Sequence, residues 1–330
     1  MSSMVSDALE ARVASRARLR RRRRLQHYGL VLLFLSPWIL GFCAFFLYPM
    51  GASLYYSFTS YDLLSSPRWV GFANYRFLLT EDPLFWQSVR NTLWIIVIGV
   101  PLRLAFAIFT AMLLTAPRRG VKLYRTLFYL PTLAPPVAAV LAFVVLLNPE
   151  NGPVDQALGT AGLPAPLWFQ DPAYAKWGLV LLGLWGVGDA MIIMLAGLLD
   201  VPRSLYEAAV TEGANAWHKF RYVTIPMLSP VILFTLVIGI INGFQYFTEG
   251  YVAGNTASGV TPGDATSTPL GEPQGSLLFY SMWLYQQGFR YFHMGYASAM
   301  AWLLFLATMV FTLLLVKTSD RWVHYGSNLG

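Results

Sequence analysis

The sequence has few charged residues and almost no cysteine. Only 12% of its 330 residues are Asp, Glu, Lys or Arg, and 56% are hydrophobic, whereas soluble domains carry about 25% charged residues. The single cysteine, Cys43, lies in an apolar run and excludes a disulfide framework or a cysteine-based metal site. These shortages predict a polytopic membrane protein.

Catalytic motifs are also missing from the sequence. The histidines at positions 27, 218, 293 and 324 do not form H-E-x-x-H, and there is no G-x-x-x-x-G-K-[ST]. The chain therefore lacks a phosphate-binding loop of its own, and we expect it to bind no metal and no cofactor. If ATP drives its function, another chain hydrolyses the ATP. An intramembrane enzyme would need clustered catalytic residues, and the apolar runs contain none.

The net charge of +7 comes mainly from an arginine-rich N-terminal tail. Residues 1–27 hold eight arginines before an apolar run, which is typical of a disordered cytoplasmic tail at an anionic membrane surface, not of a nucleic-acid-binding protein. The run Gly29–Met50 is long enough to span a bilayer and lacks an A-x-A cleavage site. Phe42 is also a poor residue before a lipidated Cys43. We expect an uncleaved first span.

Five more apolar runs are about as long as a membrane-spanning helix. They are Asn91–Leu114, Tyr124–Leu147, Trp177–Leu199, Val231–Phe247 and Met294–Val316. Prolines at positions 101, 131, 135 and 136 predict kinks, which a packed helical bundle tolerates. The expected fold is all-α, with six transmembrane helices between residues 28 and 325 and a short tail at 326–330.

Basic residues are unequally distributed between the two sides of these spans. With the N-terminus inside, the cytoplasmic segments hold 17 of the 23 Lys and Arg residues and the outer segments hold four. This asymmetry predicts that both termini, and the segment 202–230, lie in the cytoplasm. Residues 248–293 contain a stretch rich in Gly, Thr, Ser and Pro, which predicts a flexible outer loop.

The segment 202–230 is the longest one that is polar on a helical repeat. Ser204 and Glu207 have the spacing of a capping box, which predicts a helix from the next residue, 205. Gly213 permits a sharp turn that a residue with a Cβ would resist. A second short helix is then expected over residues 214 to about 222.

The end of this segment predicts how the second helix stops. Pro226 is expected to follow its last residue, and Ser229 with Pro230 is expected to start the next span as an N-cap and first helical position. The result would be an L-shaped pair of helices joined stiffly to a membrane helix, a shape on which another protein can push.

The letters E-A-A-x-x-E-G-A in this segment carry a resemblance. Together with Ile225-Pro226 they resemble the EAA loop of ABC importer permeases, closest to the binding-protein-dependent carbohydrate permeases of the maltose and glycerol-phosphate type. That family usually has Asp where this chain has Glu, a change that keeps the charge. The residues concerned are Glu207, Ala208, Ala209, Glu212, Gly213 and Ala214.

Other stretches are similar to the same family and extend the resemblance over roughly residues 29–325. They are Gly71-Phe72-Ala73-Asn74-Tyr75, Asn148-Pro149 with Gly152, Gly295-Tyr296-Ala297-Ser298-Ala299 and Arg321-Trp322-Val323-His324-Tyr325. The N-terminal region and the last of these patterns resemble the F-like or A-like member of the maltose or glycerol-phosphate permease pair.

The resemblance implies a permease subunit in a prokaryotic cytoplasmic membrane that imports a sugar, oligosaccharide or related polyol. It implies a second, distinct six-span permease, two ATPase subunits that use ATP and Mg, and an extracytoplasmic solute-binding protein. It also implies that the six EAA-loop residues form a coupling helix seated in a groove of the ATPase. A glutamate in a capping box, however, needs no partner protein.

Charged and polar residues within the spans mark the expected substrate path. Asp189 and Arg103 lie about midway along the fourth and second spans, where charges usually face a partner or a wet cavity. Asp189 either contacts the substrate or pairs with Arg103. Sugar recognition needs aromatic faces and short polar groups, although aromatic residues in spans more often serve packing. The further candidates are Asn242 with Gln245, Tyr246, Trp185 and Trp302.

Two other functions remain open at this point. An ABC importer for a non-sugar solute fits the same motifs. An ion-coupled secondary transporter or channel would be supported by inverted repeats, discontinuous helices or several buried carboxylates, and the sequence offers one midspan aspartate and no clear repeat. The sequence names neither the solute nor the role of the outer loop.

Overall fold

The computed structural model describes residues 30–116, 119–257 and 270–324. The tails predicted at 1–27 and 326–330 and the middle of the predicted outer loop lie outside these residues. The chain divides into two compact units, Met1–Tyr56 and Ser57–Gly330.

The described part of the first unit is helical. The helix Leu30–Ser57 is long and apolar enough to cross a membrane, and none of its most apolar stretch is buried within the chain. It contains a π-helical turn, η1 (Cys43–Leu47), and continues as α2 (Tyr48–Ser57). Three aromatic rings at i, i+4 spacing stack along it, with centroids 5.5 Å apart for Trp38 and Phe42 and 5.9 Å apart for Phe42 and Phe46.

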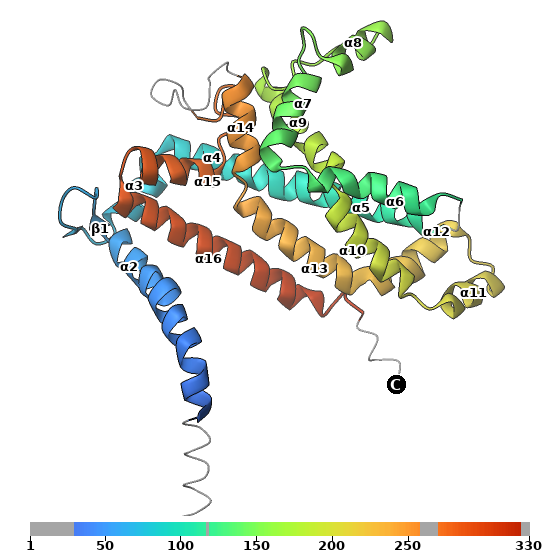
Figure 1. Cartoon of the computed structure of the whole chain (residues 1–330), viewed down its shortest axis with the longest axis horizontal. Helices are drawn as coiled ribbons and strands as arrows, with labels where there is room; N and C mark the ends of the chain where they lie inside the picture. The colour runs from blue at the N-terminus through green and yellow to red at the C-terminus, as the bar shows by residue number, and fades with distance from the viewer. Residues whose placement is uncertain (1–29, 117–118, 258–269, 325–330) are drawn as a thin grey trace, which may run out of the picture. The chain divides into compact units, whose positions relative to one another are not determined.

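The second unit is a bundle of helices with one small two-stranded ribbon (Figure 1). The ribbon pairs β1 (Thr59–Ser60) with β2 (Arg68–Trp69) in antiparallel register. The helices of its first half are α3 (Ala73–Thr80), α4 (Pro83–Trp94), η2 (Ile95–Gly99), α5 (Val100–Thr115), α6 (Val121–Tyr129), η3 (Leu130–Leu133), α7 (Pro136–Leu146) and α8 (Pro153–Thr160). Those of its second half are α9 (Pro172–Trp185), α10 (Gly188–Leu199), α11 (Arg203–Thr211), α12 (Ala216–Lys219), η4 (Phe220–Thr224), α13 (Ile225–Phe244), α14 (Thr248–Ala257), α15 (Tyr280–Tyr285), η5 (Gln286–Arg290) and α16 (Met294–Ser319).

The described residues contain four continuous helices that are long and apolar enough to span a membrane. They are Leu30–Ser57, Pro83–Thr115, Ala216–Phe244 and Met294–Ser319. Two pairs of helices pass the same test although each pair is bent. The first pair is Val121–Leu133, which comprises α6 and η3, followed by α7, and the second pair is α9 followed by α10. The number of spans is six if each bent pair is counted as one span. The prediction of a mostly helical, polytopic fold is confirmed, and six spans are reached on that count.

Five prolines lie inside the continuous helices of the described residues without breaking them, at positions 37, 49, 101, 226 and 230, and three of the five follow a π-helical turn. Pro49, Pro101 and Pro226 each stand two residues after a five-residue π-helical turn, η1, η2 and η4 respectively. A proline ring clashes with the carbonyl group four residues earlier in a regular α-helix. The wider π turn carries hydrogen bonds of the i+5 type, such as the one from the Val100 amide to the Ile95 carbonyl group. We infer that this turn gives the ring the room it needs.

Elsewhere the helices do break. The axis turns by 100° between Leu133 and Pro136, where two successive prolines, Pro135 and Pro136, leave an extended connection. The second break, of 48°, separates Trp185 from Gly188. A Cβ at Gly188 would lie 2.7 Å from the Phe128 carbonyl oxygen, so a glycine is required for this close approach.

Two hydrophobic clusters hold the second unit together. One joins α5, α10 and the start of α13, with Ala107, Met191, Met194 and Leu228 fully buried. The other gathers side chains of α4, α7, α9 and α16 around the segment that ends in Phe279, and Phe279 itself is fully buried.

A set of buried polar contacts fixes the segment around α15 to its neighbours. Asp82 caps α4 by accepting from the amides of Leu84 and Phe85, and its other oxygen accepts from the Trp283 indole at 2.8 Å and from the Tyr296 hydroxyl. One carboxylate therefore ties the beginnings of α4 and α16 to α15.

Asn91 makes a second buried crosslink in the same region. Its amide donates to the carbonyl groups of Gly275 and Leu278, and its oxygen accepts from the Lys176 ammonium group at 2.9 Å. The described flanks of the predicted outer loop at 248–293 are ordered into helices, and the flexibility predicted for its core stays a prediction. These flanks form α14, α15 and η5, because buried apolar side chains such as Leu277 anchor a segment whose composition looks loop-like.

Candidate functional site

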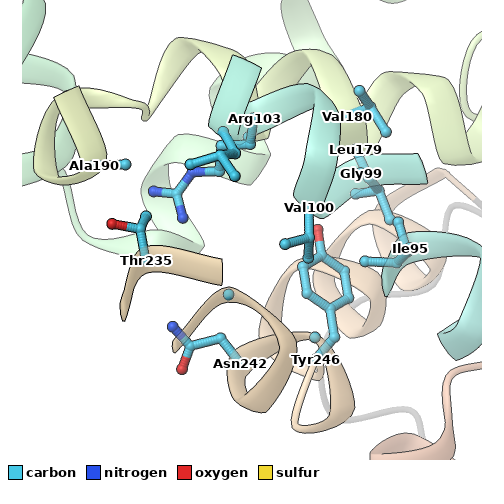
Figure 2. Close-up of a pocket in the computed structure, with 14 residues that line it drawn as sticks. Ile95, Gly99, Val100, Arg103, Leu179, Val180, Ala190, Thr235, Asn242 and Tyr246 are labelled. Atoms are coloured by element: carbon cyan, nitrogen blue, oxygen red, sulfur yellow. The ribbon is translucent and has the colours of Figure 1, made fainter. Parts of the chain in front are cut away.

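A cavity of about 120 Å³ lies between α5, the α9–α10 pair and α13. Its lining is mostly apolar, and the polar side chains that reach it are Arg103, Thr235, Asn242 and Tyr246 (Figure 2). At about 30 Å³ per water molecule, as in the liquid, the volume holds on the order of four ordered water molecules. A cavity with this mixture suits a small solute with an apolar body and several hydroxyl groups.

One face of α13 forms one wall of the cavity. Thr235, Gly239, Asn242 and Gly243 line it from α13, where their spacing of three or four residues places them on one side of the helix. Tyr246 reaches the cavity from two residues past the end of α13. The Thr235 hydroxyl already donates to the Val231 carbonyl oxygen, so it offers the cavity an acceptor. The Asn242 amide offers both a donor and an acceptor.

The opposite wall carries an ion pair. An Nη2 of Arg103 donates to Asp189 Oδ1 at 2.6 Å and to the Gly186 carbonyl oxygen at 3.0 Å. The side chains are 34% and 51% exposed. Arg103 Nε is buried and has no partner among the described atoms. The pair joins α5 to the break between α9 and α10, and it leaves guanidinium donors for a further acceptor.

Glycines control the width of the cavity in two different ways. A Cβ at Gly183 would meet nothing within 4 Å, so this glycine opens space. A Cβ at Gly239 would lie 2.7 Å from Cγ1 of Val100, so this glycine lets α13 approach α5 closely. The first glycine shapes the hollow, and the second shapes the packing that encloses it.

The structure separates the residues that sequence reasoning had grouped as the substrate path. Asn242 and Tyr246 line the cavity, but Gln245 is exposed and caps the end of α13 outside the lining. The expected role of Asn242 and Gln245 as a pair in the substrate path stays a prediction, because only Asn242 of the two lines this cavity. Asp189 pairs with Arg103, one of the two arrangements expected for it, and its contact with substrate stays a prediction.

The two tryptophans lie away from the cavity. Trp185 packs on Phe143 with ring centroids 5.4 Å apart, and Trp302 packs edge-on against Phe305 at 5.5 Å. Neither lines the hollow. Sequence reasoning missed Thr235 and Gly183 because a lone threonine or glycine in an apolar run gives no signal of what it faces.

The EAA-loop residues lie on and after α11, where the structure buries no side chain. Glu207 and Ala208 are exposed, as are Glu212 and Gly213, whereas Ala209 and Ala214 are half-buried. The predicted capping box is wrong: the N-cap is Pro202, and no side chain caps the helix. Proline already fixes a backbone angle compatible with a helix start, so the helix begins two residues earlier than predicted.

The predicted turn at Gly213 is present, with φ of +79°. The second helix begins at Ala216, where the Asn215 side chain accepts from the His218 amide as an N-cap. Its predicted stop before Pro226 is wrong. The helix runs without a break from Ala216 to Phe244.

The π turn η4 before Pro226 explains that continuity. Because the helix continues, Pro230 lies inside α13, and the Ser229 hydroxyl donates to the Pro226 carbonyl oxygen. Ser229 and Pro230 therefore do not start a helix as predicted. One hydrogen bond links the two arms of the L, between the hydroxyl groups of Tyr206 and Thr224 at 3.0 Å. One continuous helix therefore leads from the exposed L to the cavity wall.

Comparisons with known proteins agree with this architecture. The chain is 42% identical over 295 residues to the "Probable ABC transporter permease protein YesP" of Bacillus subtilis, which covers 89% of this chain and 91% of that protein. It is 32% identical over 300 residues to the "Arabinooligosaccharides transport system permease protein AraP" of Bacillus subtilis, over 89% and 90% of the two chains. It is 33% identical over 289 residues to the "Lactose transport system permease protein LacF" of Rhizobium radiobacter, over 86% and 91%.

The fold is similar to that of a chain in the crystal structure of a bacterial ABC transporter involved in the import of the acidic polysaccharide alginate. The TM-score is 0.75 at 21% identity, over 92% of this chain and 99% of that one. Residues 103–325 match the family described as "Binding-protein-dependent transport system inner membrane component". The chain belongs to this family and is a multi-pass inner-membrane component of a transport system.

Proposed function

We propose that this chain is the transmembrane permease subunit of an ATP-driven importer for a sugar, an oligosaccharide or a related polyol. The observation that carries the proposal is that relatives at least 32% identical, matched over 86% or more of this chain, are named as arabinooligosaccharide and lactose permeases. Family membership supports a transport role without catalysis by this chain, and a separate ATPase subunit would use ATP and Mg.

The cavity supports a polyhydroxylated cargo. Each sugar hydroxyl both donates and accepts a hydrogen bond. Arg103 offers donors, Thr235 offers an acceptor, and the Asn242 amide offers both. The apolar lining between them suits the C–H faces of a sugar ring. In this proposal Asp189 acts through Arg103, which it orients.

The exposed L supports the coupling role of the EAA loop. α11 buries none of its own side chains, and Glu207 stands exposed upon it. The positive-inside asymmetry of the sequence supports a cytoplasmic position for both termini and for α11. In the proposed cycle, ATP-driven closure of two ATPase subunits moves the L, and the helix from Ala216 to Phe244 transmits the movement to the cavity wall.

The proposed complex contains further subunits. A solved alginate transporter of similar fold, with a TM-score of 0.74, is described in complex with an alginate pentasaccharide-bound periplasmic protein. By analogy, a solute-binding protein would deliver the solute to the outer face of this chain. A second six-span permease would complete the pathway, because the described residues supply at most six spans.

The proposal is tested by purifying the tagged chain from its native membranes in mild detergent and identifying its partners by mass spectrometry. We expect a P-loop ATPase, a second permease and a solute-binding protein. The binding protein would then be screened against sugars, polyols, amino acids and phosphate. Recovery of this chain alone would contradict the importer, and a binding protein that takes only a non-sugar solute would contradict the carbohydrate cargo.

A further inference from the structure

An open, basic recess lies at the turn between α5 and α6, far along the chain from the cavity wall formed by α13. Its volume is about 620 Å³, and three cations line it: Arg119, Lys122 and Arg125. None of the described residues that line it is acidic. Because like charges repel, three cations around one hollow favour an anion between them.

A hydrogen bond to the end of α5 holds the Arg125 side chain in place. Its Nη2 donates to the carbonyl oxygen of Leu114, at the end of α5, at 2.9 Å. Its Nε is buried and has no hydrogen-bond partner among the described atoms. The bond to Leu114 therefore fixes the guanidinium group at the edge of the recess, and the group's hydrogen bonds are not all made within the described residues.

The backbone adds to the positive potential. α6 begins after Gly120, whose φ is +83°, and no side chain caps the helix. The amides of Leu123 and Tyr124 are already bonded to the Gly120 carbonyl oxygen, so what the backbone contributes is the positive end of the helix dipole, which attracts negative charge.

The same helix carries an exposed apolar stripe. Leu123, Leu127 and Leu130 follow one another at i, i+4 and i+7 and are 62%, 52% and 58% exposed. A helix with a basic start and an exposed apolar stripe is typical of the membrane interface. Basic pockets beside membrane helices on the cytoplasmic side bind the head groups of anionic lipids.

We propose that this recess binds the phosphate of an anionic phospholipid, with Arg119, Lys122 and Arg125 around the phosphate and the acyl chains along the leucine stripe of α6 and η3. The stripe selects a lipid over a free phosphate ion, because only a lipid fills both the charged and the apolar parts of the surface. The proposal is independent of the transported solute.

The test uses the full chain with its co-purifying partners, extracted from native membranes in a neutral detergent. Phospholipids that remain bound are quantified by mass spectrometry for the wild type and for the triple variant Arg119→Gln, Lys122→Gln, Arg125→Gln. Each basic residue near a membrane surface contributes roughly fivefold to binding, so the triple variant is expected to lose affinity by about 100-fold. Retained phosphatidylglycerol and cardiolipin should fall to the level of the bulk membrane, while phosphatidylethanolamine stays constant.

A control triple variant, Arg76→Gln, Lys317→Gln, Arg321→Gln, removes the same charge from exposed residues outside the recess and outside the 202–230 segment and should retain the lipid. The variant Arg119→Lys, Arg125→Lys keeps the charge and should retain most of it, which separates binding from misfolding. In a second arm, delipidated protein is titrated with inorganic phosphate or with phosphatidylglycerol in nanodiscs, and thermal stability is followed. Equal loss of anionic lipid from both triple variants, or stabilisation by phosphate alone, would overturn the proposal.

Discussion

Two regions of the Ser57–Gly330 unit differ in whether their polar groups are buried and hydrogen-bonded within the chain. Around Asp82, the carboxylate is 7% exposed, and side chains or backbone groups from three helices use both of its oxygens. Along α11, no side chain is buried, and the helix has no side-chain cap. In the first region, the polar groups find their hydrogen-bond partners within the chain. In the second region, the helix surface is not covered by other described residues, and an uncovered surface is what docking of another protein requires.

The largest effect on the free energy of unfolding should follow from removing the Asp82 carboxylate. Asp82→Ala removes an N-cap and leaves the donors of Trp283 and Tyr296 without their acceptor in a buried site. Unsatisfied buried donors and a lost cap together cost about 3–5 kcal/mol. The free energy of unfolding in detergent, or the midpoint of thermal unfolding, should fall accordingly. Asp171→Ala, which removes only the cap of α9, is the matched control and should cost roughly 1 kcal/mol.

The two glycines of the cavity also differ in how closely the chain packs around them, and substitutions there should have smaller effects on stability. Gly239→Ala places a Cβ 2.7 Å from Val100, so we expect a loss of about 1–3 kcal/mol of stability from overpacking. Gly183→Leu meets open space instead. It should fold with unchanged thermal stability and yet reduce ATP-driven uptake in proteoliposomes by filling the hollow. A strongly destabilised Gly183→Leu, or one with normal uptake, would contradict the cavity as substrate path.

The ion pair should matter more for transport than for stability. Because Arg103 and Asp189 are 34% and 51% exposed, Asp189→Asn should change the free energy of unfolding by less than about 1 kcal/mol. Arg103→Gln removes guanidinium donors from the cavity and should lower uptake by roughly tenfold or more, as expected for a lost hydrogen bond to a charged group. Equal uptake by the wild type and Arg103→Gln would assign the pair to helix packing alone.

The smallest expected effect concerns the link between the arms of the L. Tyr206→Phe removes one hydroxyl that bonds Thr224 at 3.0 Å, which costs about 1 kcal/mol or less in stability. If that bond transmits motion, the amount of solute carried per ATP hydrolysed should fall, although the protein stays folded. An unchanged ratio of transport to hydrolysis would restrict Tyr206 to a structural role.

Much of the fold could be predicted because long apolar runs have few alternatives in a membrane protein. The error at Pro226 arose because proline normally ends a helix, and no sequence rule indicated that a π turn precedes it. The capping box at Ser204 was wrong for a similar local reason, since Pro202 already starts the helix.

The site was less accessible to sequence reasoning than the fold. Residue type suggested Asn242, Tyr246 and the pairing of Asp189 with Arg103, and the structure brings these together in or beside the cavity. Gln245 has the same chemistry as Asn242 but does not line the cavity, whereas the next residue, Tyr246, does. Residue type does not reveal which of two neighbouring residues past the end of α13 faces the cavity.

The most direct test of the open region is to compare ATPase recovery by the wild type and by Glu207→Ala. Both would be purified from native membranes with the same tag, and Glu150→Ala, at an exposed glutamate just before α8, would serve as the control. We predict that Glu207→Ala inserts and melts like the wild type but loses most of its ATPase subunit, whereas Glu150→Ala keeps it. Undiminished recovery of the ATPase by Glu207→Ala, with normal transport, would contradict the assignment of α11 as the coupling surface.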